Sequence, residues 1–159
     1  MTLSLILGII RVTPTRKKTV AYMNQERKVK IAAAVKPILA KYGMKGSLSV
    51  RNHMAIVLTL TQGKLDFIGD LQEQSNFGYF TNKIDKAEMR KRYELNVNPY
   101  WYTEHYGGES LAFLSEVIPA LKSADWYDDS DAMVDHFDTA YYFDIHVGKW
   151  DKPYILVAK

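Results

Sequence analysis

The spacing of apolar residues predicts two main helices. Between residues 24 and 42, one helical face carries Ile31, Val35, Ile38, Leu39 and Tyr42. Asn24 suits the N-cap of this helix, and Gly43 stands where a glycine commonly ends one. Residues 109–123 repeat the pattern. A proline interrupts each stretch, at positions 37 and 119, and we expect a kink or two shorter helices at Pro37 because proline removes a hydrogen bond.

Alternation of apolar and polar residues predicts the strands. Residues 47–51 and 54–61 read as a hairpin whose turn contains Asn52, a residue that tolerates the left-handed conformation. Residues 93–102 also alternate, and Pro99 indicates an edge position or a strand end.

The C-terminal residues show the clearest alternation. Between 137 and 147, alternate positions are apolar or β-branched, and residues 153–158 form a second apolar run after a turn. This pattern predicts a second hairpin. Residues 64–74 and 83–93 read as two short helices.

These elements together predict the α+β class. We expect an antiparallel sheet of about four or five strands, with the two main helices packed on one face. Residues 23–159 form a single domain on this interpretation, since 159 residues fit one domain of ordinary size.

Residues 1–22 have three interpretations. The apolar run 3–10 is too short for a membrane span, which takes about 20 residues, and it lacks the flanks of a signal peptide. It is an edge strand or docking arm, a weak membrane-surface anchor, or a segment upstream of the natural start at Met23. We favour the last and expect the folded domain to begin near Met23.

Composition and charge exclude some chemistries. The chain has no cysteine, which rules out disulfides, thiol catalysis and thiolate zinc sites. The net charge of +3 is unevenly distributed, because residues 1–46 hold ten Lys or Arg and one acid, Glu26. A basic leading end before an acidic body indicates either an interaction tail or self-complementarity.

The acidic segment 125–138 is the most conspicuous candidate site. Its carboxylates suit Mg²⁺ or Ca²⁺, although the spacing does not match an EF-hand loop. The alternatives are a solvated loop whose aspartates cap turns, or a row of charges that imitates the phosphates of a nucleic acid. A metal-dependent enzyme would use Asp128, Asp131, His136 and Asp138.

Nucleic-acid binding is an alternative function. The basic N-terminal region would contact phosphates, and aromatic residues of the sheet would stack bases. The residues predicted for these phosphate contacts are Arg16, Lys17, Lys18, Arg27 and Lys28.

Protein binding is the function that the sequence favours. No HExxH, GxSxG or Walker pattern occurs, so we assign no catalytic residue and no cofactor. Exposed tyrosine and tryptophan are typical of protein interfaces. The predicted contact surface comprises the aromatic residues Tyr100, Trp101, Tyr102 and Tyr106 and the acidic residues Asp125, Asp128, Asp129 and Asp131.

Two segments resemble a known group of proteins. Residues 136–157 (HFDTAYYFDIHVGKWDKPYILV) and 35–60 (VKPILAKYGMKGSLSVRNHMAIVLTL) resemble small uncharacterised proteins of tailed bacteriophages. They are similar to a class-29 domain associated with polyvalent proteins. The resemblance implies a phage or mobile-element accessory protein. It would act in the bacterial cytoplasm on a host or phage protein, for example against a host defence.

Overall fold

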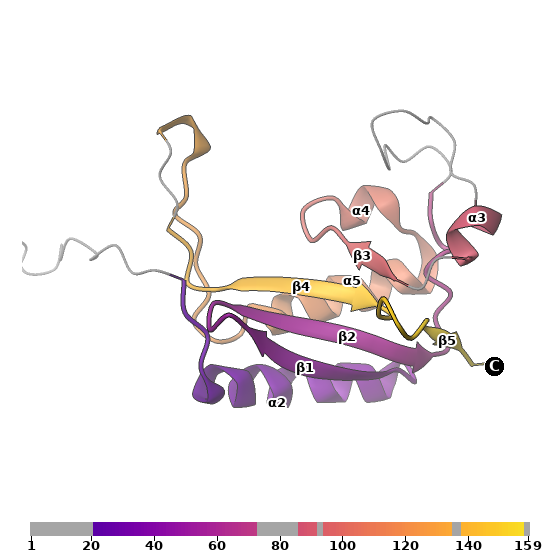
Figure 1. Cartoon of the computed structure of the whole chain (residues 1–159), viewed down its shortest axis with the longest axis horizontal. Helices are drawn as coiled ribbons and strands as arrows, with labels where there is room; N and C mark the ends of the chain where they lie inside the picture. The colour runs from indigo at the N-terminus through magenta and orange to yellow at the C-terminus, as the bar shows by residue number, and fades with distance from the viewer. Residues whose placement is uncertain (1–20, 73–85, 92–93, 135–137, 158–159) are drawn as a thin grey trace, which may run out of the picture.

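The computed structural model describes residues 21–72, 86–91, 94–134 and 138–157 (Figure 1). In chain order, the elements are α2 (Gln25–Lys41), β1 (Lys45–Arg51), β2 (Ala55–Gly63), α3 (Lys86–Arg90), β3 (Leu95–Val97), α4 (Tyr102–His105), α5 (Gly108–Leu121), the 3₁₀ turn η1 (Ala132–Val134), β4 (Tyr142–Val147) and β5 (Ile155–Leu156). The predicted extension 1–22 lies outside the described residues except for Ala21 and Tyr22.

The sheet has five strands and is mixed. Its order is β1-β2-β4-β3, with β5 paired to the far end of β2. β1 and β3 run antiparallel to their neighbours, whereas β4 and β5 both run parallel to β2. The α+β class and the number of strands are therefore confirmed, and the expectation of a wholly antiparallel sheet was wrong.

The predicted C-terminal hairpin is absent for a physical reason. β2 is nine residues long, so β4 pairs with its first part and β5 with its last two residues. The intervening loop closes on itself through the Lys149–Lys152 bridge, with Gly148 at a φ of 83°. The chain therefore continues forward along the same edge of β2 instead of turning back (Figure 1).

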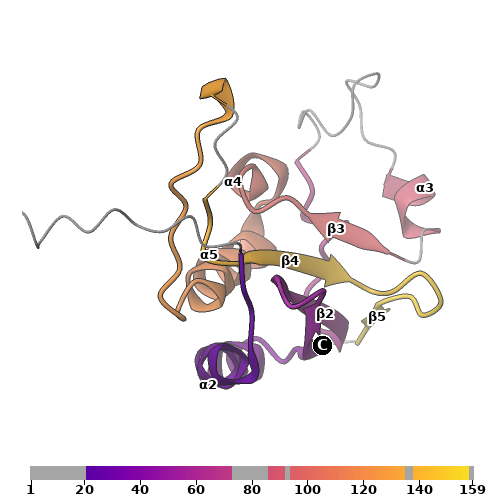
Figure 2. The same ribbon diagram turned by 60° about the vertical axis from the view of Figure 1, so that its left-hand side comes forward.

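Strand register separates the two faces of the sheet. Val50, Ile56 and Phe143 share a row on one face, and Leu48, Leu58 and Ile145 share the next. Helices α2 and α5 lie on the same side of the sheet (Figure 2), and both rows belong to or pack against the core that these helices share with the sheet. The core gathers on this face, where Ile56 and Leu58 are fully buried.

Helix α2 begins and ends where its sequence predicts. The Asn24 side chain accepts a 2.8 Å hydrogen bond from the Arg27 N–H, and Gly43 follows the helix at a φ of 64°. The helix continues through Pro37 as one element, so the alternative of two shorter helices was wrong. Helix α5 likewise contains Pro119, two residues before its end.

Other local predictions differ from the structure. Residues 64–72 form turns and a bridge, not a helix. The helix expected at 83–93 is the five-residue α3, and the strand expected at 93–102 is the three-residue β3. The β1–β2 turn is confirmed, because Asn52 and His53 both have a positive φ, of 53° and 55°.

A carboxylate from another segment caps helix α5. Asp70 Oδ2 accepts hydrogen bonds from the Ser110 N–H, at 3.1 Å, and from its hydroxyl, at 2.6 Å. The Gly107 N–H donates to the Asp70 carbonyl at 2.8 Å. Asp70 therefore supplies the acceptor that an N-cap side chain would otherwise provide, since Gly107 has none.

We expect Asp70→Ala to lower the free energy of unfolding by about 1 kcal/mol, the typical cost of a lost cap. Urea denaturation of both proteins measures the difference. Asp70→Asn is the matched control because its amide oxygen still accepts, and it should cost less. If the two variants lose the same stability, the hydrogen bonds to Ser110 do not stabilise the helix.

His105 should make stability depend on pH. Burial lowers the pKa of His105 below its usual range, while the Glu104 carboxylate partly opposes the shift. Folding therefore favours the neutral imidazole, so its contribution is complete above about pH 6.5 and is lost as the pH falls through the lowered value.

Denaturation at several pH values between 7 and 5 should show wild type losing more stability than His105→Gln. The exposed His53, changed to asparagine, is the control and should follow wild type. Parallel curves for wild type and His105→Gln would contradict this prediction.

Candidate functional site

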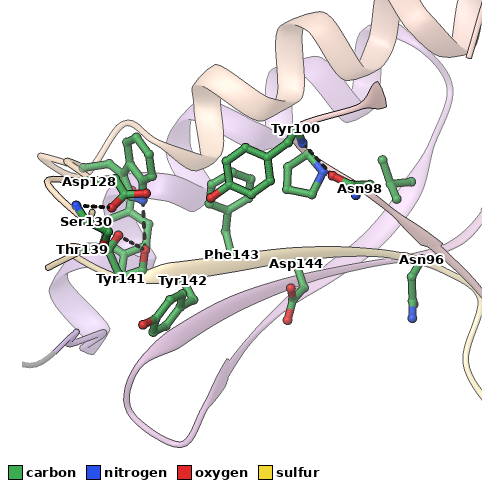
Figure 3. Close-up of a pocket in the computed structure, with 13 residues that line it drawn as sticks. Asn96, Asn98, Tyr100, Asp128, Ser130, Thr139, Tyr141, Tyr142, Phe143 and Asp144 are labelled. Atoms are coloured by element: carbon green, nitrogen blue, oxygen red, sulfur yellow. Dashed lines mark hydrogen bonds between the residues drawn. The ribbon is translucent and has the colours of Figure 1, made fainter. Parts of the chain in front are cut away.

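A broad concavity lies beside strand β4, where β3 ends. It has a volume of about 720 Å³. Residues from three separate segments line it: Asn96–Tyr100, the 126–130 segment after α5, and residues 139–144 (Figure 3). We call this concavity the β4 groove.

A gap in the sheet creates the groove. The Tyr142 N–H donates to the Met54 carbonyl just before β2, and the Gly148 N–H donates to the Leu60 carbonyl of β2, so the backbone of Phe143 faces the β3 side. β3 pairs with β4 only as far as Val97, opposite Ile145. In the next register position Phe143 would face Pro99, which has no N–H, and the chain turns away there. Among the described residues, the Phe143 backbone has no strand partner on this side.

An asparagine turn directs Tyr100 into the groove wall. The Tyr100 N–H donates to the side-chain oxygen of Asn98 at 2.9 Å, and the Trp101 N–H donates to the backbone carbonyl of Asn98 at 3.3 Å. This turn ends β3 and leaves the Tyr100 side chain 74% exposed. Figure 3 shows the Tyr100 and Phe143 side chains in the middle of the view, between Asp128 on one side and Asn98 on the other.

The opposite wall is fixed by hydrogen bonds to the backbone before β4. Trp126 Nε1 donates to the Tyr141 carbonyl at 2.9 Å, and the indole meets Phe143 edge to face at 6.1 Å. Asp128 pairs with Thr139 as an isolated bridge, and its Oδ1 accepts the Ser130 N–H at 3.0 Å. The wall is therefore held in place, with the Asp128 carboxylate at its exposed rim.

The segment beyond Asp128 projects from the body of the protein. Figures 1 and 2 both show residues 128–134 extending away from the sheet to η1. At its tip, Met133 is 92% exposed and Val134 is 69% exposed. We call residues 128–134 the acidic arm. Asp131 caps a turn in it by accepting the Met133 N–H at 3.0 Å.

The structure unites only part of the predicted contact surface. Tyr100 and Asp128 both line the β4 groove, although 28 positions separate them in the sequence. Trp101 is exposed beside Tyr100, whereas Tyr102 is half-buried against the core. Tyr106 is completely buried, so its assignment to the surface was wrong. The short helix α4 turns its ring inward against Phe67.

The remaining predicted acidic residues lie apart from the groove. Asp125 is exposed, has a φ of 55°, and pairs with Lys30 of α2 at 3.6 Å. Asp129 and Asp131 belong to the acidic arm, and the Asp129 N–H donates to the Asp138 carbonyl at 2.8 Å.

The described carboxylates do not form a metal centre. Within the described ranges, no three His, Asp or Glu side chains are placed to hold a metal ion. Asp128 and Asp131 each cap a turn, and the largely buried Asp138 lies 3.4 Å from the Tyr127 hydroxyl. His136, the fourth predicted ligand, lies outside the described residues. The interpretation as turn-capping aspartates is the one the geometry supports.

The described basic residues are partly neutralised within the fold. Arg27 donates to the Tyr22 and Ala140 carbonyls and lies over the Tyr141 ring, 5.6 Å from its centroid. Lys28 is half-buried on α2, and Lys41 pairs with Glu116 at 2.7 Å. The predicted contacts Arg16, Lys17 and Lys18 lie outside the described residues, so nucleic-acid binding stays a prediction.

Sequence reasoning missed a polar concavity on the other face of the sheet. It has a volume of about 610 Å³ and includes His146, Arg51 and the exposed Trp150. The Glu94 carboxylate bonds His146 Nδ1, and Asp144 pairs with Arg51. The alternation of Tyr142, Asp144 and His146 with buried apolar neighbours was the available signal.

No protein family, curated protein or solved structure matches the chain. The resemblance to phage proteins therefore stays a prediction. No helix in the described ranges has the length and apolar character that crossing a membrane requires.

Proposed function

We propose that this protein acts by binding another protein through the β4 groove and the acidic arm. The observation that carries the proposal is the meeting of Tyr100 and Asp128 in one concavity beside an uncovered strand edge. Aromatic side chains supply large contact areas at low entropic cost, which makes them frequent anchors of protein interfaces.

The acidic arm supports the same proposal. Two large apolar side chains, Met133 and Val134, stand at the tip of a projecting segment, where water surrounds them in the free protein. A partner seated in the groove would lie against the base of the arm, because Asp128 and Ser130 belong to both. The contact with a partner would then bury these apolar groups.

The partner we propose is a bacterial host protein or a phage protein in the bacterial cytoplasm, in keeping with the resemblance of residues 136–157. Interference with a host defence or with host machinery is one role of this kind. It needs no catalytic residue and no cofactor in this chain.

The test compares proteins retained from a bacterial lysate by immobilised wild type and by Tyr100→Ala and Asp128→Asn. Trp150→Ala and Asp151→Asn are matched controls, because they remove an exposed aromatic ring and an exposed carboxylate outside the groove. We expect one protein to be retained by wild type and both controls, and retention to fall at least about tenfold in Tyr100→Ala, the loss of one interface anchor. Titration of each variant with that purified protein should give affinities in the same order as the retention.

A protein retained equally by every variant would bind elsewhere and contradict the proposal. If only Trp150→Ala fails to retain the partner, the partner binds at the polar concavity around His146 and not at the β4 groove.

A further inference from the structure

We infer that the β4 groove binds the guanidinium group of an arginine side chain presented by the protein partner. This inference rests on the proposed function and names the chemistry of its anchor. It follows from the charge of the groove, the aromatic rings in its wall, and the unused hydrogen-bond acceptors beside them.

The groove lining is aromatic and contains carboxylates but no basic side chain. Its lining includes five aromatic side chains and two carboxylates, and no Lys, Arg or His belongs to it. The Asp144 carboxylate is already paired with Arg51. Asp128 keeps one carboxylate oxygen, Oδ2, without a hydrogen bond from the described chain, since Ser130 bonds Oδ1. A cation is therefore the complementary ligand.

The ring cluster already contacts a cation of this chain. The Lys122 ammonium lies 4.4 Å from the centroid of the Trp126 ring and 5.7 Å from that of Phe143. These distances are within the range of cation–π attraction. Lys122 does not line the groove, and the Tyr100 ring, which does, is accessible to a second cation because Tyr100 is 74% exposed.

The acceptors favour guanidinium over ammonium. Asp128 and Phe143 line the same groove as Tyr100, and each offers an acceptor: Asp128 a carboxylate oxygen, and Phe143 a carbonyl that lacks a strand partner. A planar guanidinium can stack on an aromatic face and donate in its plane to two acceptors. It is also more weakly hydrated than an ammonium, so entering an aromatic groove costs it less.

The test uses acetyl-Ala-Arg-Ala-amide as the probe and amide chemical shifts of the full ¹⁵N-labelled chain at low salt as the readout. The citrulline peptide is the matched control, because it keeps the shape and loses the charge. We expect a dissociation constant on the order of 1 mM for the arginine peptide, with shifts at the Trp126 indole and at Tyr100 and Phe143. The citrulline peptide should bind at least about tenfold more weakly, and the lysine peptide several-fold more weakly.

Two variants sharpen the result. Asp128→Asn keeps the acceptor for the Ser130 N–H and removes the charge, so it should lower the affinity for the arginine peptide at least about fivefold. Asp151→Asn should leave this affinity unchanged. Free L-arginine is a further arm. If it binds as well as the blocked peptide, a free metabolite and not a partner side chain is the ligand, which overturns the source we infer.

Equal binding of the arginine and citrulline peptides, no binding of either, or shifts confined to Trp150 and its neighbours would overturn the inference. These outcomes are separable from failure of the proposed function. A partner whose retention depends on Tyr100 would uphold protein binding even if the arginine peptide does not bind.

Discussion

Replacing Phe113 by alanine is expected to lower the free energy of unfolding by about 3–5 kcal/mol, the usual cost of truncating a buried aromatic residue. Phe113 is completely buried in α5. Its ring meets Tyr42 edge to face at 5.4 Å and Phe67 at 6.1 Å. Truncation therefore removes contacts between α5, the end of α2 and the segment after β2, and leaves a cavity that a packed core does not refill.

Urea denaturation of wild type and Phe113→Ala measures this effect. Ser115→Ala is the control, because it changes an exposed position of the same helix and should alter stability by less than about 0.5 kcal/mol. A loss of under about 1 kcal/mol for Phe113→Ala would show that this ring does not join the two helices in a common core.

Replacing Tyr141 by phenylalanine is expected to destabilise the fold by about 1–3 kcal/mol through the loss of one buried hydroxyl. The Tyr141 hydroxyl donates to the Leu121 carbonyl at 2.6 Å and accepts the Ala124 N–H at 3.4 Å. Leu121 and Ala124 are both buried, so their backbone groups would lose a partner that water does not replace. This hydroxyl ties the end of α5 to the residue that precedes β4.

Tyr142→Phe is the matched control for Tyr141→Phe. Tyr142 is the next residue and is 49% exposed, so water can hydrate its hydroxyl. The Tyr142→Phe variant should therefore lose little stability. Thermal unfolding of the three proteins gives the comparison. Equal melting temperatures for Tyr141→Phe and Tyr142→Phe would contradict the structural role of the buried hydroxyl.

Local patterns predicted the local elements well. Asn24 and Gly43 bound α2 because capping depends on residues within one turn of the helix end. Asn52 and His53 turn β1 into β2 for a similarly local reason. The same reasoning gave a hairpin at the C-terminus, where pairing depends on the distant strand β2. The continuous burial of residues 55–60 on both faces shows how completely β2 is enclosed.

The candidate site could be predicted only in part. Tyr100 and Tyr106 are six residues apart and chemically identical, yet one is 74% exposed and the other completely buried. Their difference depends on the Asn98 turn and on α4, which a single-sequence pattern does not resolve. The groove itself needs β3 to end at Val97 while β4 continues, a feature of strand pairing between separate segments. The sequence could indicate which residue types form the site, but not that the fold brings Tyr100 and Asp128 into one groove.

Photo-crosslinking to the captured partner tests the central claim, protein binding through the β4 groove, most directly. A benzophenone amino acid would replace Tyr100 in the groove, Trp150 on the opposite sheet face, and Val29 on the exposed side of α2, in three separate proteins. We predict an efficient crosslink from position 100 and little or none from positions 29 and 150. Crosslinks from position 29 or 150 without one from position 100 would contradict the claim and place the partner on another surface.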